Sequence, residues 1–289
     1  MDRSALKSIF AAVAAASAMA VCAAGSEARW YLQVDNDVVF GEDRWYSSGI
    51  RIARVKDDFE WGVLQEIYTP EGKRFSEGTV DRRPAGRLLA YGAFQCRMDD
   101  FFQTLELALG MRGPSALGRQ ATENIHHVIA APYVDWSRQY DNEVDAHAGF
   151  VHSQRFGEAF KVHVGGVLGN QVAFAHAGFE ARVGANPRHS SQLLRYVATP
   201  PFDPRETRGW SGYAGVSGRV VARNALLTSG YDPLAPPPTR KRTVVRSVAG
   251  VAWTRSWGAV TFEVAQDSRE FDEQRVPQRF GSAAVHIAF

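Results

Sequence analysis

Short segments in which apolar side chains alternate with polar or small ones follow one another through most of the chain. The clearest lies within residues 102–111, where Leu105, Leu107, Leu109 and Met111 alternate with Thr104, Glu106 and Ala108. A period of two places the two sets on opposite faces of a β-strand. Repeated segments of roughly ten residues with this pattern predict an all-β transmembrane barrel, whose strands face lipid on one side and the lumen on the other.

The pattern predicts twelve antiparallel strands, an even number as in bacterial outer-membrane barrels. We expect them at residues 29–36, 48–56, 61–68, 86–97, 102–112, 142–154, 158–167, 173–185, 208–222, 242–256, 258–267 and 280–289. The last strand ends the chain at Phe289, and a terminal amphipathic strand with a final aromatic residue resembles the signal read by the outer-membrane assembly machinery. The alternative is a secreted β-sandwich whose last strand ends in Phe.

The lengths of the predicted connections test this arrangement. Connections after odd-numbered strands are long, at residues 69–85, 113–141, 223–241 and 268–279, whereas those at 57–60, 98–101 and 155–157 are short. Outer-membrane barrels have short periplasmic turns and longer extracellular loops. The long connection at 186–207 is the exception: either the strand count slips there, or this barrel has a large periplasmic turn.

The first residues have the composition of a targeting segment. Arg3 and Lys7 precede an Ala-rich apolar run from Ile9 to Ala24, which ends near a small-x-small cleavage pattern. These features predict a secretory signal peptide over residues 1–28 and a barrel over residues 29–289. After this segment no apolar run approaches the roughly 20 residues that a membrane-spanning helix needs.

The formal net charge is only +2 at pH 7, so no overall basic field favours a nucleic-acid partner. Basic residues do gather locally, with Arg82 and Arg83 in one expected outer loop and Arg240 and Lys241 in another. Such loop charges are ordinarily solvated surface. On the outer leaflet of an outer membrane, Arg and Lys donors also suit the phosphates of lipopolysaccharide.

Residues 113–143 form the one long segment with helical rather than alternating periodicity. A short helix is predicted over Arg119–Ala131, with Ile125, Val128 and Ile129 at helical spacing and Pro132 closing it. The pair His126-His127 lies within it, and adjacent residues point about 100° apart around a helix. A histidine near an apolar stripe is either a structural residue or a candidate base.

Oxygen-bearing side chains gather where the first strand ends and the second begins. Residues 35–37 read Asp-Asn-Asp, and residues 43–49 read Asp-Arg-Trp-Tyr-Ser-Ser-Gly. Such side chains can hold a hard cation such as Ca²⁺. The same residue types are also common in ordinary loops.

Seven short motifs occur in an order that resembles the lipid A 3'-O-deacylase family. They are DND at 35–37, YSSG at 46–49, QEIYTP at 65–70, DRRPAG at 81–86, GPSALG at 113–118, the helix with His126, and DWSRQYDNE at 135–143. They cover about half of the chain that follows the signal peptide, and the C-terminal half is similar only as a generic barrel. The resemblance implies a twelve-stranded outer-membrane barrel with a short helix in an extracellular loop.

The resemblance also implies an activity, which is Ca²⁺-dependent hydrolysis of the ester-linked 3'-acyloxyacyl group of lipid A. It assigns His126 as the base that activates water, and Asn36, Asp37 and Ser47 as support for the ion or the oxyanion, with Asn36 and Asp37 as the metal ligands. We further expect the lipid A or lipopolysaccharide substrate to contact Arg82, Arg83 and Thr122. These residue types suit ester hydrolysis, which needs a base active near neutral pH and positive charge or hydrogen-bond donors at the carbonyl oxygen.

Two positions depart from the family pattern. Thr122 stands where the family often has Gln, one helical turn before the histidine, and Ala131-Pro132 stands near the place of a family Glu. Glu123, Asp135 and Glu143 are candidate substitutes for that Glu.

The departures keep a second hypothesis open, a non-catalytic lipopolysaccharide-binding or structural outer-membrane barrel. A third, an outer-membrane phospholipase, needs a histidine followed by a nucleophilic serine along one strand. The two His-Ser pairs of the chain, His152-Ser153 and His189-Ser190, lie at a strand end and in the irregular connection at 186–207.

Overall fold

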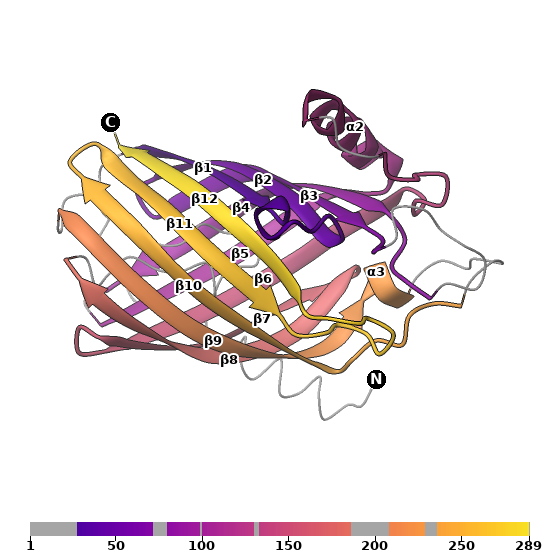
Figure 1. Ribbon diagram of the computed structural model, residues 1–289. Coiled ribbons are helices and arrows are strands. Elements are labelled where there is room, and N and C mark those ends of the chain that lie inside the picture. The colour runs from indigo at the N-terminus through magenta and orange to yellow at the C-terminus, as the bar shows by residue number, and fades with distance from the viewer. Residues whose placement is uncertain are drawn as a thin grey trace.

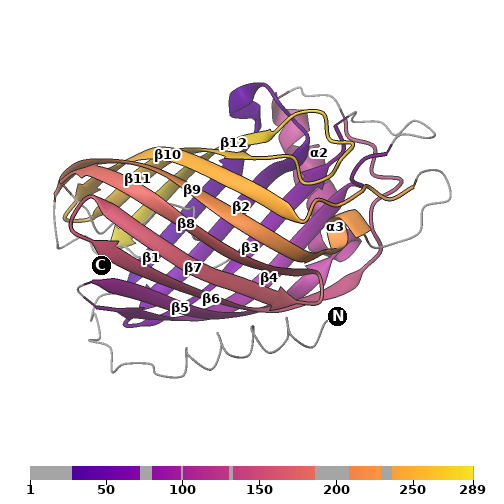
Figure 2. The same ribbon diagram turned by 90° about the horizontal axis from the view of Figure 1, so that it is seen from below.

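Twelve antiparallel strands close into a single barrel in the computed structural model, which describes residues 28–71, 80–98, 100–129, 133–185, 208–228 and 236–288 (Figure 1). Each strand pairs with its neighbours in sequence, and β1 closes the barrel against β12 (Figure 2). The predicted strand number and fold class are confirmed. The strands are β1 (Arg29–Asn36), β2 (Trp45–Lys56), β3 (Phe59–Thr69), β4 (Ala85–Arg97), β5 (Phe101–Arg112), β6 (Glu143–Phe156), β7 (Phe160–Gly169), β8 (Val172–Gly184), β9 (Gly209–Asn224), β10 (Thr243–Arg255), β11 (Gly258–Asp267) and β12 (Gln278–Ala288).

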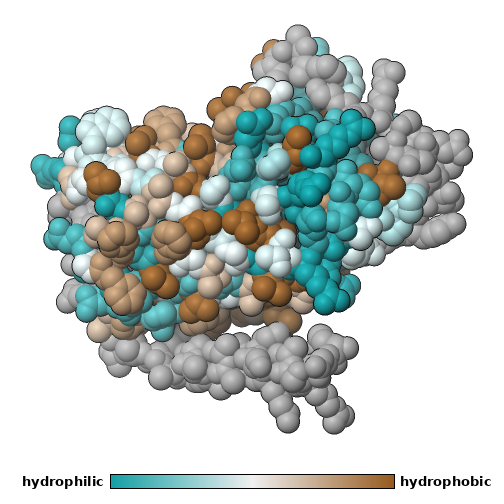
Figure 3. Space-filling model, turned by 60° about the horizontal axis from the view of Figure 1, so that its bottom comes forward, coloured by the Kyte–Doolittle hydropathy of each residue, from teal (hydrophilic) through white to brown (hydrophobic). Residues whose placement is uncertain are grey.

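The alternation along each strand separates a lipid-facing surface from a polar lumen. On β1, Trp30, Leu32 and Val34 are exposed on the outer wall, whereas Gln33 and Asp35 are buried inside. Hydrophobic side chains are spread over the wall in Figure 3, and hydrophilic ones gather toward the loop-bearing end. A polar interior with an apolar outer band is the arrangement that a bilayer requires of a barrel.

Four short helical elements lie in the connections at one end of the barrel. They are η1 (Val38–Phe40), η2 (Pro114–Ala116), α2 (Gly118–Ile129) and α3 (Ala225–Thr228). The opposite end carries the start of β1, the end of β12 and tight turns such as residues 57–58 (Figure 1). Residues 1–27 of the predicted signal peptide, the connection 186–207 and Phe289 lie outside the described residues, so the predictions made for them stay predictions.

Helix α2 lies outside the barrel, over the loop-side ends of β3 and β4 (Figure 1). It begins one residue earlier than predicted and is described to Ile129. Of the expected apolar stripe, Ile125 is half-buried and Val128 is 82% exposed. Thr122 and His126, one turn apart, are buried. None of the helices within the described ranges has the length and apolar character needed to cross a membrane.

Glycines allow α2 to approach the wall closely. A Cβ atom on Gly118 would lie 2.7 Å from the Cα atom of Gly86 on β4, a distance that no real side chain tolerates. Beside this contact Gln65 on β3 donates to the carbonyl of Ala116 at 2.7 Å, and Ala121 packs on Ile67 and its neighbours. The helix is therefore held by close backbone approach, a hydrogen bond from Gln65 and the packing of Ala121.

Helix α3 lies across the loop-side mouth of the lumen (Figures 1 and 2). Leu226 and Leu227 are both buried, and Leu227 packs against Trp45 and Phe271. The Tyr140 hydroxyl donates to the carbonyl of Leu226 at 2.7 Å. These contacts place an apolar plug at the end of the barrel that carries α2.

Candidate functional site

A cavity of about 490 Å³ lies at the loop-side end of the barrel, and its lining comes from the β1–β2 connection, β2, β3 and α2. Five of the seven predicted site residues line it: Asn36, Asp37, Ser47, Thr122 and His126. The residues come from positions up to ninety apart in sequence, and the docking of α2 on the wall brings them together.

The β1–β2 connection folds back on itself through hydrogen bonds from its own backbone. The Asn36 side-chain oxygen accepts the Val38 N–H at 2.7 Å, and the Asp37 carboxylate accepts the Arg44 N–H at 2.7 Å. Gly41 adopts φ 69°, in the left-handed region that a residue without Cβ enters without strain. This closed loop places both Asp37 and Asp43 in the lining of the cavity.

Ser47 sits at a β-bulge in the pairing of β2 with β3, between Tyr46 and Ser48. A bulge re-aims the side chains of the longer strand. Here the Ser47 hydroxyl lies 2.5 Å from the Thr69 hydroxyl of β3, and Ser47 is only 6% exposed. The bulge thus holds a hydroxyl pair at the wall of the cavity.

His126 is 8% exposed and lines the cavity, whereas the neighbouring His127 is exposed to solvent. The His126 Nε2 atom lies 3.5 Å from the Asp43 Oδ2 atom. That distance is longer than a charge-assisted hydrogen bond and within ion-pair range. One turn earlier the Thr122 hydroxyl donates to the Gly118 carbonyl at 2.9 Å, which satisfies it within the helix.

Four carboxyl groups line this cavity, on Asp37, Glu42, Asp43 and Glu71, together with Arg44, which pairs with Glu42 and with Glu71 at 3.0 Å each. Burial raises the pKa of Asp37 to about 8, the Arg44 N–H opposes the rise, and the negative charges of Asp43 and Glu42 add to it. A carboxyl group in such surroundings gains from a nearby cation. Throughout the described ranges, however, no three His, Cys, Asp or Glu side chains gather as a ready-made metal site.

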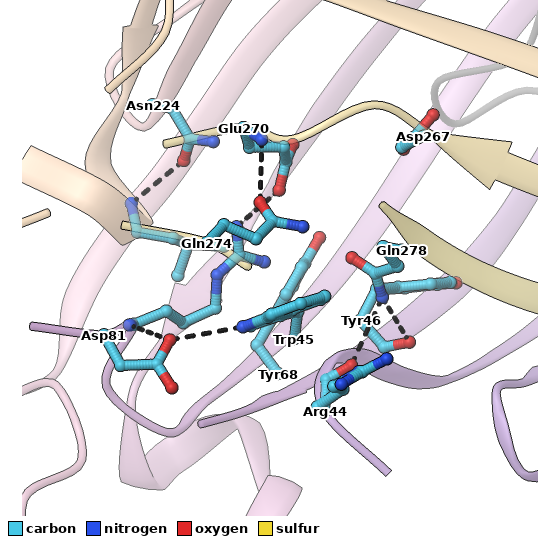
Figure 4. A network of polar contacts seen from close by, with 12 residues as sticks. Arg44, Trp45, Tyr46, Tyr68, Asp81, Asn224, Asp267, Glu270, Gln274 and Gln278 are labelled. Atoms are coloured by element: carbon cyan, nitrogen blue, oxygen red, sulfur yellow. Dashed lines mark hydrogen bonds and ion pairs between the residues drawn. The ribbon is translucent and has the colours of Figure 1, made fainter. Parts of the chain in front are cut away.

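The two predicted substrate-binding arginines lie elsewhere. Arg82 is 1% exposed, its guanidinium pairs with Glu270 at 2.5 Å, and it lines a separate cavity at the lumen mouth. Figure 4 shows the polar network of this mouth, where Asp81 accepts the Trp45 indole N–H at 3.2 Å. Arg83 donates to the carbonyl of Arg138 at 2.6 Å. Neither arginine lines the cavity that contains His126.

Each of the three candidate substitutes for the family Glu has another partner. Glu123 pairs with Arg119 at 2.7 Å, Asp135 caps the Ser137 N–H at 2.9 Å, and Glu143 pairs with Arg112 at 2.9 Å.

The carboxylate beside His126 comes instead from Asp43, across the cavity. Asp43 belongs to the oxygen-rich segment at residues 43–49, and Thr69 belongs to the QEIYTP motif. Nothing in the sequence paired either one with a site residue.

Together the fold and the cavity define an outer-membrane β-barrel with a polar, acid-lined and histidine-containing site on its outer wall. The family model described as "Outer membrane protein LpxR" matches residues 8–289, so the chain belongs to the LpxR family of outer-membrane lipid A deacylases. The resemblance recognised in the sequence is thereby confirmed, as is the outer-membrane location.

Comparison with a solved structure of this family supports the fold. LpxR from Salmonella typhimurium superimposes with a TM-score of 0.76 at 19% identity, over 90% of this chain and 100% of that one. The β-domain of the Bordetella autotransporter BrkA gives a TM-score of 0.41 at 11% identity, over 92% of this chain and 100% of that one. A comparison with curated protein sequences gives no match.

Proposed function

We propose that this protein hydrolyses the ester that links the 3'-acyloxyacyl group to lipid A, with His126 as the general base. One observation carries the proposal: Asn36, Asp37, Ser47 and His126, which come from three separate segments, line one cavity on the outer wall at the loop-bearing end. Long loops mark the extracellular end of such barrels. A wall cavity at that end opens toward the leaflet in which lipid A resides.

His126 would take a proton from water as the water oxygen attacks the ester carbonyl carbon. The tetrahedral intermediate then expels the sugar 3' oxygen, which receives that proton from the imidazolium, and the acyloxyacyl acid is released. Asp43 lies beside Nε2. It therefore favours a proton on Nε2 and leaves Nδ1 to act on water, and it stabilises the imidazolium that forms. In this role Asp43 takes the place of the family Glu.

The residues around Asp37 suit the Ca²⁺ that the resemblance implies. The donors lining the cavity include carboxylate, amide and hydroxyl oxygens, the ligands that a hard cation prefers, and a bound cation would offset the burial that raises the pKa of Asp37. Asp37 and Asn36 would hold the ion, with Ser47 next to them. When bound, Ca²⁺ supplies positive charge for the developing oxyanion. Because no three acidic or histidine side chains converge in the described part of the chain, backbone oxygens, water or substrate would complete its shell.

For substrate recognition we keep Thr122, Arg82 and Arg83 as the expected contacts. Thr122 is part of the cavity, one turn from the base. Arg82 and Arg83 lie in the loop that borders the lumen mouth, where each already has a protein partner. Contacts to lipopolysaccharide phosphates by these arginines would therefore be additional to those partners.

The rival is a non-catalytic barrel that either binds lipopolysaccharide or is structural. The activity test below separates the first form from the proposal, and one feature of the fold opposes a porin-like second form. Helix α3 and its buried leucines lie across the mouth of the lumen, an arrangement that opposes an open pore. The phospholipase alternative is also weak, because the consecutive residues His152 and Ser153 occupy opposite faces of β6. The other pair, His189-Ser190, lies outside the described residues.

The test is to express the chain in bacterial outer membranes and to profile lipid A by mass spectrometry. We expect loss of the 3' acyloxyacyl group with the wild type and with His127→Ala, and intact lipid A with His126→Ala. His127 is the matched control because it neighbours the base but faces solvent.

Unchanged lipid A with a folded wild-type barrel would refute the function. Full activity of the His126→Ala protein would refute only the assignment of the base. Phospholipids profiled in the same extracts separate the phospholipase alternative.

A further inference from the structure

An arginine faces the membrane from the barrel end opposite the cavity. Arg54 lies on β2 between Trp30 of β1 and Trp61 of β3, and the strand register pairs it directly with both. Both tryptophans point outward and are 43% and 40% exposed. The three side chains thus form a lateral row on the outer wall, near the turn at residues 57–58.

The guanidinium of Arg54 is held between the two indole rings. Its central carbon lies 5.7 Å from the Trp30 ring centroid and 5.6 Å from the Trp61 ring centroid. Both distances are in the range of cation–π attraction, which fixes the plane of the group. The Nε atom is buried and has no hydrogen-bond partner within the described ranges, and no carboxylate there forms an ion pair with Arg54.

The residues around this row indicate how deep in the bilayer Arg54 lies. The next outward side chains toward the barrel middle are Leu32, Ile52 and Val63, each about half exposed. The other neighbour is a short turn, as expected at the periplasmic end. Aromatic residues in such a position lie at the level of the lipid headgroups.

We propose that Trp30, Arg54 and Trp61 bind the phosphodiester headgroup of a phospholipid in the periplasmic leaflet. A cation facing lipid is costly unless an anion neutralises it, and a guanidinium bonds two phosphate oxygens at once. The apolar row of Leu32, Ile52 and Val63 would then contact the acyl chains, which selects a lipid over a free phosphate ion.

A second outward-facing arginine provides an internal comparison. Arg255, at the end of β10, lies 4.6 Å from the ring centroid of Trp253 alone and is exposed. It has one indole where Arg54 has two. If sandwiching between two rings makes the site, substitution of Arg255 leaves lipid binding unchanged.

The experiment measures lipid retention by native mass spectrometry of the full barrel in detergent. The probes are dioleoylphosphatidylglycerol and dioleoylglycerol, which share acyl chains and differ in the phosphate. We expect the wild type and Arg255→Gln to prefer the phospholipid by about tenfold, and Arg54→Gln to lose that preference. Arg54→Lys, a point charge without the planar fork, should retain part of it.

Three results would overturn the proposal: equal retention by Arg54→Gln and the wild type, an equal loss in Arg255→Gln, or no preference for the phosphate-bearing lipid. Displacement of the phospholipid by millimolar inorganic phosphate would also overturn it, because the site would then be a free-anion site. Heat-dependent gel migration checks that each variant is folded. None of these readouts depends on lipid A deacylation, so the two proposals fail separately.

Discussion

The protein buries charged side chains in two regions that differ in how the charges are balanced. In the lumen, the Asp267 carboxylate forms ion pairs with Arg246 at 2.6 Å and with Arg219 at 3.0 Å. The Asp145 carboxylate pairs with Arg87 at 2.7 Å. In the wall cavity, Asp37 instead accepts a backbone N–H and lies near two further carboxyl groups.

This contrast separates structure from function. A buried carboxylate matched by a guanidinium can replace its lost hydration within the protein. In the cavity Arg44 compensates Glu42 and Glu71, whereas Asp37 is held by a backbone N–H. A buried carboxyl group with a perturbed pKa is a candidate functional group. We therefore propose that Asp37 accepts a cation, whereas Asp145 and Asp267 in the lumen already pair with arginines.

The strongest test of this contrast is removal of the cation. Chelation of divalent ions should lower lipid A deacylation by roughly 100-fold or more, because charge stabilisation of the oxyanion is lost. Added Ca²⁺ should restore the rate. Asp37→Ala should show the same loss and no further effect of chelation, as measured by mass spectrometry of lipid A after timed incubation. Full activity of the wild type in chelator would show that Asp37 has another role.

A smaller effect is expected at Asp43. Asp43→Asn should lower kcat roughly 10- to 100-fold with little change in KM, since a residue that orients a catalytic histidine acts on the reaction and not on substrate binding. Asp43→Glu should recover part of the rate. Glu123→Gln is the control, because Glu123 is also a carboxylate near His126 on α2 but pairs with Arg119. Equal losses in Asp43→Asn and Glu123→Gln would point to a general electrostatic effect.

The smallest effect concerns the lumen mouth and appears in stability alone. Burial raises the pKa of Asp81, and N–H groups of Glu71, Arg82 and Trp45 oppose the rise. A carboxyl group with a raised folded pKa stabilises the fold most below its unfolded pKa, and this contribution is lost as pH rises through the folded pKa.

Asp81→Asn removes this titration and weakens one hydrogen bond, at a cost of about 1 kcal/mol in acid. The difference in heat-denaturation midpoint between wild type and variant should therefore narrow from pH 4 upward. Deacylation by the folded variant should be unchanged, and a loss of activity would contradict the separation of the two regions.

Much of the barrel was predictable because its rules are local. Alternation with a period of two decides which face of a strand meets lipid, and it placed all twelve strands with small errors at their ends. The start of β2 is one such error: the strand begins at Trp45, three residues before its predicted start, because a bulge beside Ser47 interrupts the alternation. A bulge depends on the partner strand and has no local pattern.

The candidate site also has a part that the sequence predicts and a part that it does not. The amino-acid types and their order determined that Asn36, Asp37, Ser47 and His126 were candidates, and helical geometry implied that only one histidine of the pair would face the wall. The tertiary structure alone decided that Asp43 lies beside His126, that Thr69 holds Ser47, and that Arg82 turns into the lumen mouth. Those neighbours depend on how a loop closes and how a helix docks on the sheet. Residues that meet in this way can lie far apart in the sequence, so no local sequence pattern predicts the contact.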